Sequence, residues 1–154
     1  MPPIVSTIEI ARTPEEVFAY VTDPSRFAEW QKDVVSVRIA GDRALSVGSR
    51  FTTTRRIGRV ERTMTQQITE ISPPRSWAVH GVDGPIRPHV KLTVEPLNDG
   101  AWSRVTIALD FEGHGIGKPL LPLVRKQAQK GAPMSYRNLK ELLESGADRA
   151  IRLQ

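Results

Sequence analysis

The sequence predicts a single α+β domain in which a long C-terminal helix covers one face of an antiparallel β-sheet. Six segments with alternating apolar and polar residues follow one another, joined by short turn sequences, which is typical of an antiparallel meander. One further strand and two short helical segments precede them. The last segment has helical periodicity, and it is the only predicted element long enough to cover an apolar sheet face.

The N-terminal part predicts a strand over 4–10 and then two short helices. Thr13-Pro14-Glu15-Glu16 supplies a capping threonine, a proline suited to the first turn and a glutamate that completes a capping box. Asp23-Pro24 ends the first helix, and Asp23 can cap the second one, which carries Phe27 and Trp30.

The later elements are separated by turn sequences rich in glycine, asparagine, aspartate and proline. The final helix is expected from about 118 to 144, with a kink or break near 129–133, because Pro133 has no N–H and crowds the preceding turn. We expect one domain over 1–146 and a frayed tail over 147–154. The six strands of the meander are predicted at 34–39, 50–57, 60–71, 75–82, 86–96 and 102–111.

Composition and charge narrow the possible functions. The 154 residues suit one domain, and the absence of cysteine excludes disulfides, thiolate metal ligands and cysteine nucleophiles. No apolar run reaches the ~20 residues that span a bilayer, so we predict no integral membrane association and a cytoplasmic location. The net charge of +5 is spread along the chain without interleaved aromatic residues, so nucleic-acid binding is not predicted.

Successive side chains of a strand point to opposite faces of the sheet, so the position of each hairpin turn shows which residues of the two strands share a face. We call this assignment the parity of the hairpin. A turn at Asp99-Gly100 pairs apolar residues of the last two strands, with Val90 opposite Leu109, and this face therefore packs inward. A turn at Asp83-Gly84 places Trp77 opposite Val90 on the same inward face.

The three histidines fall outside this apolar face. The same parity places His80 and His89 on the outer face, and His114 lies in a glycine-rich loop. Because the sequence shows no metal-ligand spacing, surface histidines are the expected reading, and neither a metal site nor a cofactor is predicted.

The hairpin that turns at Gly58 places two arginines on its inner face. An arginine that faces an apolar concavity needs an anionic partner, a bound group or an opening to water. We expect Arg62 to meet a polar group of a bound molecule, with a bulge that turns it outward as the alternative. Arg55 lies nearer the tip and is expected to project past the helix. Glu70 shares the inner parity but lies at the far end of its strand.

The middle of the final helix carries small residues where it should face the sheet. Ala128, Gly131, Ala132 and Ser135 follow one another at helical spacing. They leave space beneath the helix, either for a ligand or for bulky side chains of the sheet.

Two stretches carry a family resemblance. Residues 8–30 combine a strand, a Pro-Glu-Glu-Val helix start and an Asp-to-Trp segment, and the glycine-rich loop at 113–117 precedes Pro119-Leu120-Leu121 and a helix that ends Asn138-Leu139-Lys140. Together they resemble the START-like (SRPBCC) superfamily, especially its polyketide cyclase/dehydrase and lipid-transport branch, over nearly the whole chain. The resemblance implies a helix-grip fold, in which a curved sheet wraps around the C-terminal helix and leaves a hydrophobic cavity. We find no match to a catalytic signature.

Three functions stay open at this point, as do enzyme activity and oligomeric state. The leading hypothesis is the binding of a hydrophobic molecule, such as a lipid, polyketide or aromatic acid, with an anionic or oxygenated end met by Arg62. The second is a polyketide cyclase or dehydratase that uses the same cavity, approached by Tyr20 and Tyr136. The third is a partner-binding or stress-response module with a filled core. The predicted ligand-binding residues are Phe51, Thr53, Arg62, Met64, Gln66, Trp77, Val79, Val90, Leu92, Leu109, Phe111, Val124 and Ala128.

Overall fold

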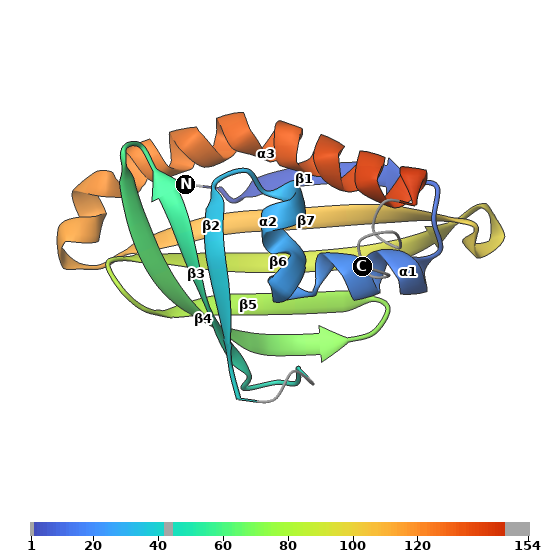
Figure 1. The fold of residues 1–154 in the computed structure, drawn as a ribbon, viewed down its shortest axis with the longest axis horizontal. Coiled ribbons are helices and arrows are strands. Elements are labelled where there is room, and N and C mark those ends of the chain that lie inside the picture. The colour runs from blue at the N-terminus through green and yellow to red at the C-terminus, as the bar shows by residue number, and fades with distance from the viewer. Residues whose placement is uncertain (1, 42–44, 147–154) are drawn as a thin grey trace.

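Within residues 2–41 and 45–146, which the computed structural model describes, seven strands form one antiparallel sheet in the order β1-β7-β6-β5-β4-β3-β2. The long helix α3 arches over this sheet (Figure 1), so the predicted α+β helix-grip architecture is confirmed. The predicted tail over 147–154 lies outside the described residues. In chain order the elements are β1 (Ile4–Ile10), α1 (Pro14–Val21), η1 (Pro24–Arg26), α2 (Phe27–Trp30), β2 (Val34–Ala40), β3 (Arg50–Ile57), β4 (Val60–Ser72), β5 (Ser76–Asp83), β6 (Ile86–Leu97), η2 (Asn98–Gly100), β7 (Trp102–Gly113), η3 (Gly115–Leu120) and α3 (Leu121–Ser145).

Both predicted helix starts are capped as the sequence indicates. The Thr13 hydroxyl accepts a hydrogen bond from the Glu16 N–H at 3.3 Å and donates to the Glu16 carboxylate at 3.0 Å, which satisfies an otherwise unpaired donor at the start of α1. The Asp23 carboxylate likewise accepts from the Ser25 N–H at 3.1 Å at the start of η1. These caps mark where α1 and η1 begin, and α2 follows directly after η1.

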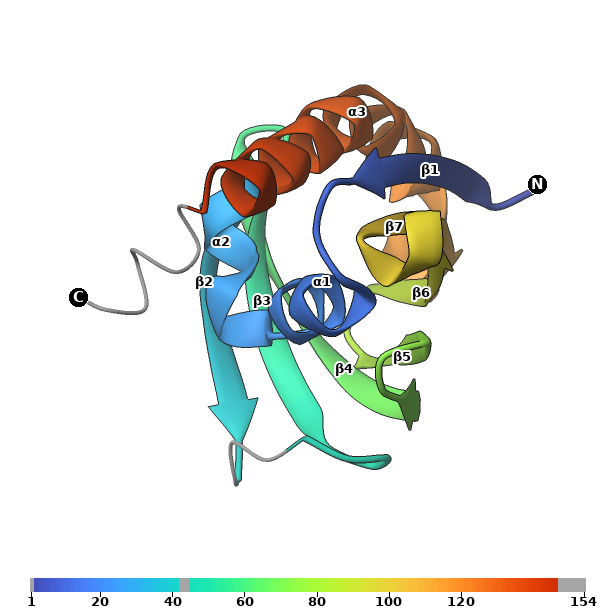
Figure 2. The same cartoon turned by 90° about the vertical axis from the view of Figure 1, so that its right-hand side faces the viewer.

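The two edge strands of the sheet are the first two strands of the chain. β1 pairs with β7 and β2 pairs with β3, so α1, η1 and α2 cross from one edge to the other. Seen end-on, the sheet curls and α3 lies between β1 on one side and α2 and β2 on the other (Figure 2). The sheet therefore grips the helix between its two edges.

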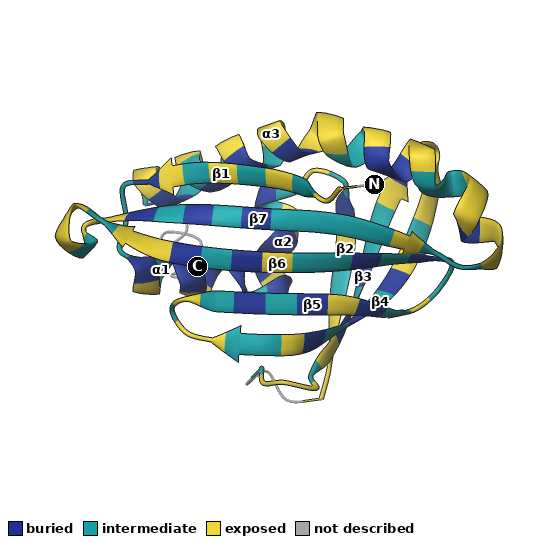
Figure 3. Ribbon diagram, turned by 180° about the vertical axis from the view of Figure 1, so that it is seen from behind, coloured by how far each residue is buried: buried dark blue, intermediate teal, exposed yellow. Residues whose placement is uncertain are grey.

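The register predicted for the β6–β7 hairpin is confirmed, and so is the face predicted for Arg55 and Arg62 in the β3–β4 hairpin. Val90 pairs with Leu109 in the β6–β7 ladder, and Arg55 pairs with Arg62 in the β3–β4 ladder. Burial alternates along these strands, with one face buried and the other facing water (Figure 3).

The predicted register of β5 against β6 is wrong by two residues. Trp77 pairs with Leu92, and Val79 pairs with Val90. The turn is centred on Gly84-Pro85 rather than on Asp83-Gly84, and Gly84 adopts the positive φ of 91° that glycine tolerates. A shift of two residues keeps each side chain on its face, so the inward placement of Trp77 and Val79 is unchanged.

A bulge in β4 overturns the inward placement of Glu70. The register shifts between Ile68 and Glu70, and the extra residue turns Glu70 to the outer face. There Lys91 Nζ donates to the Glu70 carboxylate at 2.7 Å, and this hydrogen bond lowers the pKa of Glu70. Ile71 packs against the core in its place.

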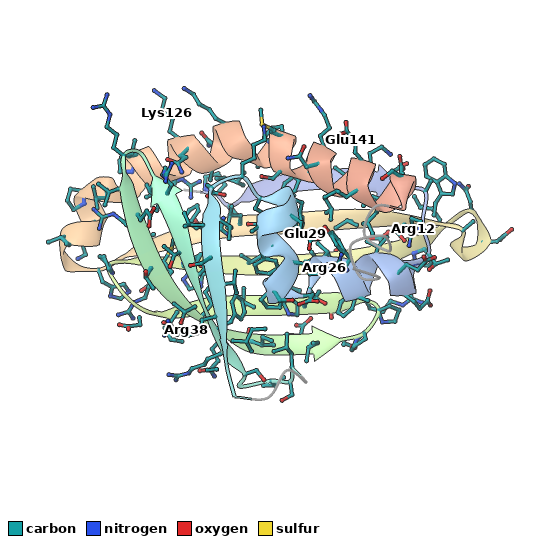
Figure 4. The ribbon with its side chains drawn as sticks, in the orientation of Figure 1. Arg12, Arg26, Glu29, Arg38, Lys126 and Glu141 are labelled. Carbon is teal, nitrogen blue, oxygen red and sulfur yellow. The ribbon has the colours of Figure 1, made fainter. Side chains whose placement is uncertain are left out.

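Helix α3 is continuous, which contradicts the predicted break. It runs through Pro133 without interruption and starts at Leu121, after the 3₁₀ segment η3. Pro133 is exposed, so its ring sits on the side of the helix that faces solvent. Lys126 and Glu141 also point away from the sheet (Figure 4). The helix therefore keeps a polar outer side and an inner side that faces the sheet.

Candidate functional site

A cavity of about 230 Å³ lies beneath the N-terminal half of α3. Its wall is formed by α2, α3 and the inner faces of strands β3 to β7. The core is therefore not filled by its own side chains in this half of the molecule. Of the thirteen residues predicted to bind a ligand, ten line this cavity: Met64, Gln66, Trp77, Val79, Val90, Leu92, Leu109, Phe111, Val124 and Ala128.

The other three predicted residues do not line the cavity. Phe51 lies behind the wall, fully buried and stacked on Trp77 with ring centroids 6.4 Å apart. Thr53 is also buried, and its hydroxyl donates to the Gln66 side-chain oxygen at 3.1 Å, which orients that amide. Arg62 faces the same side of the sheet but is half-exposed and lies outside the lining.

Arg55, expected to project past the helix, is the arginine that lines the cavity. Its Nη1 donates to both carboxylate oxygens of Asp33 at 3.0 and 3.1 Å, and its Nη2 donates to the Gln31 side-chain oxygen at 2.6 Å. Gln31 and Asp33 lie in the segment that joins α2 to β2, and β2 is the neighbour of β3. Arg55 on β3 therefore reaches this segment, whereas Arg62 is one strand further away.

Two tryptophans of the cavity wall have indole N–H groups without a hydrogen-bond partner in the described part of the chain. Nε1 of Trp30 and Nε1 of Trp77 are both buried and unpaired among the described residues, although both indoles line the cavity. A buried donor without a partner costs about 1–3 kcal/mol, so turning either indole until its N–H meets an acceptor brought by a ligand would be favourable. Trp30 was predicted only as a residue of the second short helix. No spacing in the sequence brings α2 next to β5.

The two tyrosines differ in their relation to the cavity. Tyr136 of α3 lines it and packs near Trp30, with ring centroids 6.4 Å apart. Burial raises the pKa of Tyr136 to about 12, against the smaller opposite effect of the positive charge of Arg55, so its hydroxyl stays protonated at neutral pH. Tyr20 lies outside the lining, and its hydroxyl donates to Glu29 at 2.7 Å.

A contact between α3 and the β3–β4 hairpin lies at the wall of the cavity. Gln127 of α3 lines the cavity and accepts a hydrogen bond from the Gly58 N–H at 2.9 Å. Its amide also donates to the Arg56 carbonyl at 2.7 Å. The tip of the hairpin reaches the helix at this point (Figure 1). Gln127 thus ties the hairpin tip to the helix that covers the cavity.

The family assignment agrees with this architecture. The family model described as polyketide cyclase / dehydrase and lipid transport matches residues 1–144. The chain belongs to this family. Membership supports hydrophobic-ligand binding or cyclase-type activity as the general class of function. No protein of curated function matches the sequence. None of the described helices combines the length and apolar character that a membrane span requires.

Solved structures share the fold at low sequence identity. TTHA0849 from Thermus thermophilus is 17% identical with a TM-score of 0.76, and the alignment covers 94% of this chain and 99% of that one. The di-domain ARO/CYC BexL from the BE-7585A biosynthetic pathway is 16% identical with a TM-score of 0.69; 94% of this chain and 47% of BexL are covered. Ara h 8.0201 is 13% identical with a TM-score of 0.67, with 93% and 97% covered. At these identities the likeness establishes the fold alone.

Proposed function

We propose that this member of the family binds a compact, largely apolar small molecule that carries a neutral hydrogen-bond-accepting oxygen. The observation that carries the proposal is the pair of unpaired indole N–H groups, of Trp30 and Trp77, in the wall of an apolar cavity. A ketone, ester or phenol oxygen would accept a hydrogen bond there, while the rest of the molecule contacts aliphatic and aromatic side chains. Cytoplasmic location and the absence of nucleic-acid binding stay predictions.

The size of the cavity supports a compact ligand. Pockets that enclose drug-sized molecules measure about 300–1,000 Å³. The cavity of about 230 Å³ lies below that range, so a bicyclic aromatic molecule or a short acyl chain suits it better than a long lipid.

The pairing of Arg55 with Asp33 supports a neutral rather than an anionic ligand, and Lys32, the other cation of the lining, is exposed. The guanidinium of Arg55 is already matched by the Asp33 carboxylate at 3.0 Å and by Gln31. A ligand carboxylate would have to compete with Asp33 for the same donors, and it would be repelled by that carboxylate. We therefore propose that the two tryptophans, rather than Arg62, meet the polar end of the ligand.

The lining supports binding more than catalysis. None of the described lining residues is a histidine. Tyr136, with a pKa raised to about 12, cannot take up a proton at neutral pH, and the Asp33 carboxylate is paired with Arg55. The described residues therefore offer hydrogen-bond donors at the cavity but no free general base.

Calorimetric titration with three matched probes tests the proposal. Naphthalene has no acceptor, 2-acetylnaphthalene has a neutral carbonyl, and 2-naphthoate carries a negative charge. We expect 2-acetylnaphthalene to bind most tightly and 2-naphthoate no more tightly than naphthalene. W30F or W77F should weaken 2-acetylnaphthalene by about 2- to 10-fold, which corresponds to one net hydrogen bond, and leave naphthalene unchanged.

The exposed Trp102 provides the control, because it lies on β7 outside the cavity lining. W102F should bind all three probes as the wild type does. If W30F and W77F weaken both neutral probes equally, the indoles act by shape and the hydrogen-bonding role is wrong. Failure of all three probes to bind would reject the cavity as a binding site.

A further inference from the structure

A cluster of titratable side chains on the outer face of the sheet contains all three histidines of the chain. His80 of β5 and His89 of β6 are direct cross-strand partners, and Glu112 of β7 lies beside them. Val90, next to His89 in β6, lines the cavity, so the cluster occupies the opposite side of the same wall. His114, just after β7, contacts the same carboxylate.

The two paired imidazoles are spaced as neighbouring ligands of one metal ion. Nδ1 of His80 lies 3.0 Å from Nδ1 of His89, with the ring planes at 86°. Two nitrogens that each bind Zn²⁺ at about 2.0–2.1 Å stand roughly 2.9–3.4 Å apart for bond angles between 90° and tetrahedral. The pairing of His80 with His89 brings the two nitrogens to this separation. One of them carries the hydrogen of their mutual contact, so a metal requires the rings to turn and His80 to move its hydrogen from Nδ1 to Nε2.

Glu112 sets the proton of His89 on the side away from His80. Nε2 of His89 lies 3.0 Å from a carboxylate oxygen of Glu112. An ionised carboxylate only accepts, so the proton sits on Nε2 and the lone pair of Nδ1 faces His80. This is the carboxylate–histidine arrangement that supports metal-bound imidazoles in proteins. The other oxygen of Glu112 lies 2.7 Å from Nε2 of His114.

The charged side chains next to Glu112 bind other groups. Arg87 is the register partner of Glu112, but its Nε donates to the Gly84 carbonyl at 3.2 Å. Asp110, the other outward-facing carboxylate next to the cluster, is held by Arg125 at 2.7 Å. The cluster therefore combines two imidazoles with one carboxylate whose contacts, among the described residues, are imidazoles.

We propose that His80 and His89, supported by Glu112, form a surface binding site for a divalent first-row transition-metal ion such as Zn²⁺, Ni²⁺ or Cu²⁺. Nδ1 of each histidine supplies a ligand, Glu112 fixes His89 and adds negative charge, and water completes the coordination. Imidazole nitrogen selects these ions over Mg²⁺ and Ca²⁺, which prefer oxygen ligands. The site revises the expectation that these are ordinary surface histidines.

Metal binding here would cross-link the sheet behind the cavity. His80 and His89 form the last described pair of the β5–β6 ladder, next to the close approach of Gly81 to Arg87. A metal held by both strands binds the folded chain only, because the two histidines meet only when the strands pair. The thermal midpoint should therefore rise with metal concentration.

Isothermal titration of protein without a polyhistidine tag tests the site, with ZnCl2, NiCl2 and MgCl2 as titrants. We expect Zn²⁺ and Ni²⁺ to bind and Mg²⁺ not to bind. H80Q and H89Q should each lower Zn²⁺ affinity more than about 10-fold, and E112Q about 10-fold. H114Q is the matched control, since His114 touches Glu112 without facing the ligand nitrogens, and it should stay within about 3-fold of the wild type.

Two results would overturn the site. If the H80Q/H89Q double variant binds Zn²⁺ as tightly as the wild type does, the metal binds elsewhere. If H114Q loses as much Zn²⁺ affinity as H80Q does, the set of ligands is different. ¹⁵N spectra of the wild-type imidazoles need no variant, and they should show Zn²⁺ shifting Nδ1 of two histidines. Affinity for 2-acetylnaphthalene should be unchanged in the histidine variants, which separates this site from the proposed function.

Discussion

The two halves of α3 cover the same sheet with opposite results. In the C-terminal half, Leu139 and Leu143 are fully buried in a closely packed core that includes Ile10, Val17 and Val105. Toward the N-terminus of α3, the buried Val124 is followed on the side facing the sheet by the small residues Ala128 and Gly131, and a cavity of about 230 Å³ lies beneath this part of the helix.

The difference lies in the helix rather than in the sheet. Beneath the cavity the sheet presents Val90, Leu92 and Leu109, which are as apolar as the residues beneath the packed half. Where α3 offers leucine the space is filled, and where it offers Ala128, Gly131 or Ser135 it stays open. Side-chain volume along one helix stripe therefore decides whether this sheet encloses a core or a binding site.

The largest expected effect compares one buried residue from each half. Leu139→Ala should destabilise the protein by about 2–5 kcal/mol, because it opens a new cavity in a packed region. Met64→Ala removes a side chain that already borders the cavity, so fewer contacts are lost and about 2 kcal/mol or less is expected. Urea unfolding of both variants measures the difference. Equal costs would show that the two halves are packed alike.

The next effect concerns Tyr136, which lines the cavity. Its pKa is raised by burial from 10.0 to about 12, so the folded state holds the proton more tightly than the unfolded state. The stability that depends on the neutral hydroxyl is present below pH 10 and falls as the pH rises toward 12. The loss should be on the order of 1 kcal/mol between pH 10 and 11.

Denaturant unfolding at pH 9, 10 and 11 measures this slope. Y136F has no ionisable hydroxyl at this position, so its stability should fall less steeply over the same range. Parallel curves for Y136F and the wild type would contradict the burial-raised pKa.

Filling the cavity beneath α3 should remove ligand binding without a large loss of stability. Ala128→Leu places apolar volume in the cavity, and we expect affinity for 2-acetylnaphthalene to fall more than about 10-fold while stability changes by less than about 1 kcal/mol. The control is Gln129→Leu, because Gln129 is exposed on the same helix and outside the lining. Retained binding in A128L would place the ligand elsewhere.

The smallest expected effect on stability distinguishes Arg55 from Arg62, the two arginines that pair in the β3–β4 ladder. Arg55→Gln removes the ion pair with Asp33, and because both side chains are partly exposed the cost should be about 0.5–1 kcal/mol. Arg62→Gln removes the same charge from the paired position, and no described side chain pairs with it, so no measurable change is expected. Thermal unfolding of both variants checks this. A larger loss in R62Q would reverse the assignment.

Sequence reasoning reached most of the fold because local signals agreed with one another. Thr13 and Asp23 marked helix starts, and the Gly58 and Asp99-Gly100 hairpins set parity correctly for four strands. Pro133 misled the prediction, because an exposed proline can be accommodated in a helix held by packing on its other side.

The outer histidine pair escaped prediction for a definable reason. A turn at Asp83-Gly84 implied that His80 lay opposite Arg87, whereas the turn at Gly84-Pro85 places it opposite His89. Parity, which is all that face assignment needs, survives an error of two residues, but the identity of a cross-strand partner does not. Sites made of paired residues therefore demand an accuracy of register that core assignment does not.

The place of Arg55 at the cavity was not predicted, for a different reason. Arg55 and Arg62 are cross-strand partners on one face, so parity cannot choose between them. The choice is made by Gln31 and Asp33, which reach Arg55 only because β2 lies beside β3 at the edge of the sheet. Such contacts come from strand order and sheet curvature, and no local pattern encodes them.

The pairing of β1 with β7 has a consequence for how the chain assembles during synthesis. Ile4 lies opposite Leu109, whereas each strand from β3 to β7 pairs with its predecessor in the chain. Closing a long loop costs more entropy than closing a short turn, so we expect the meander to form first and β1 to dock late. β1 is synthesised before the other strands of the sheet, so it waits for β7 to emerge. Until then, the β7 edge that it will cover is open to other chains.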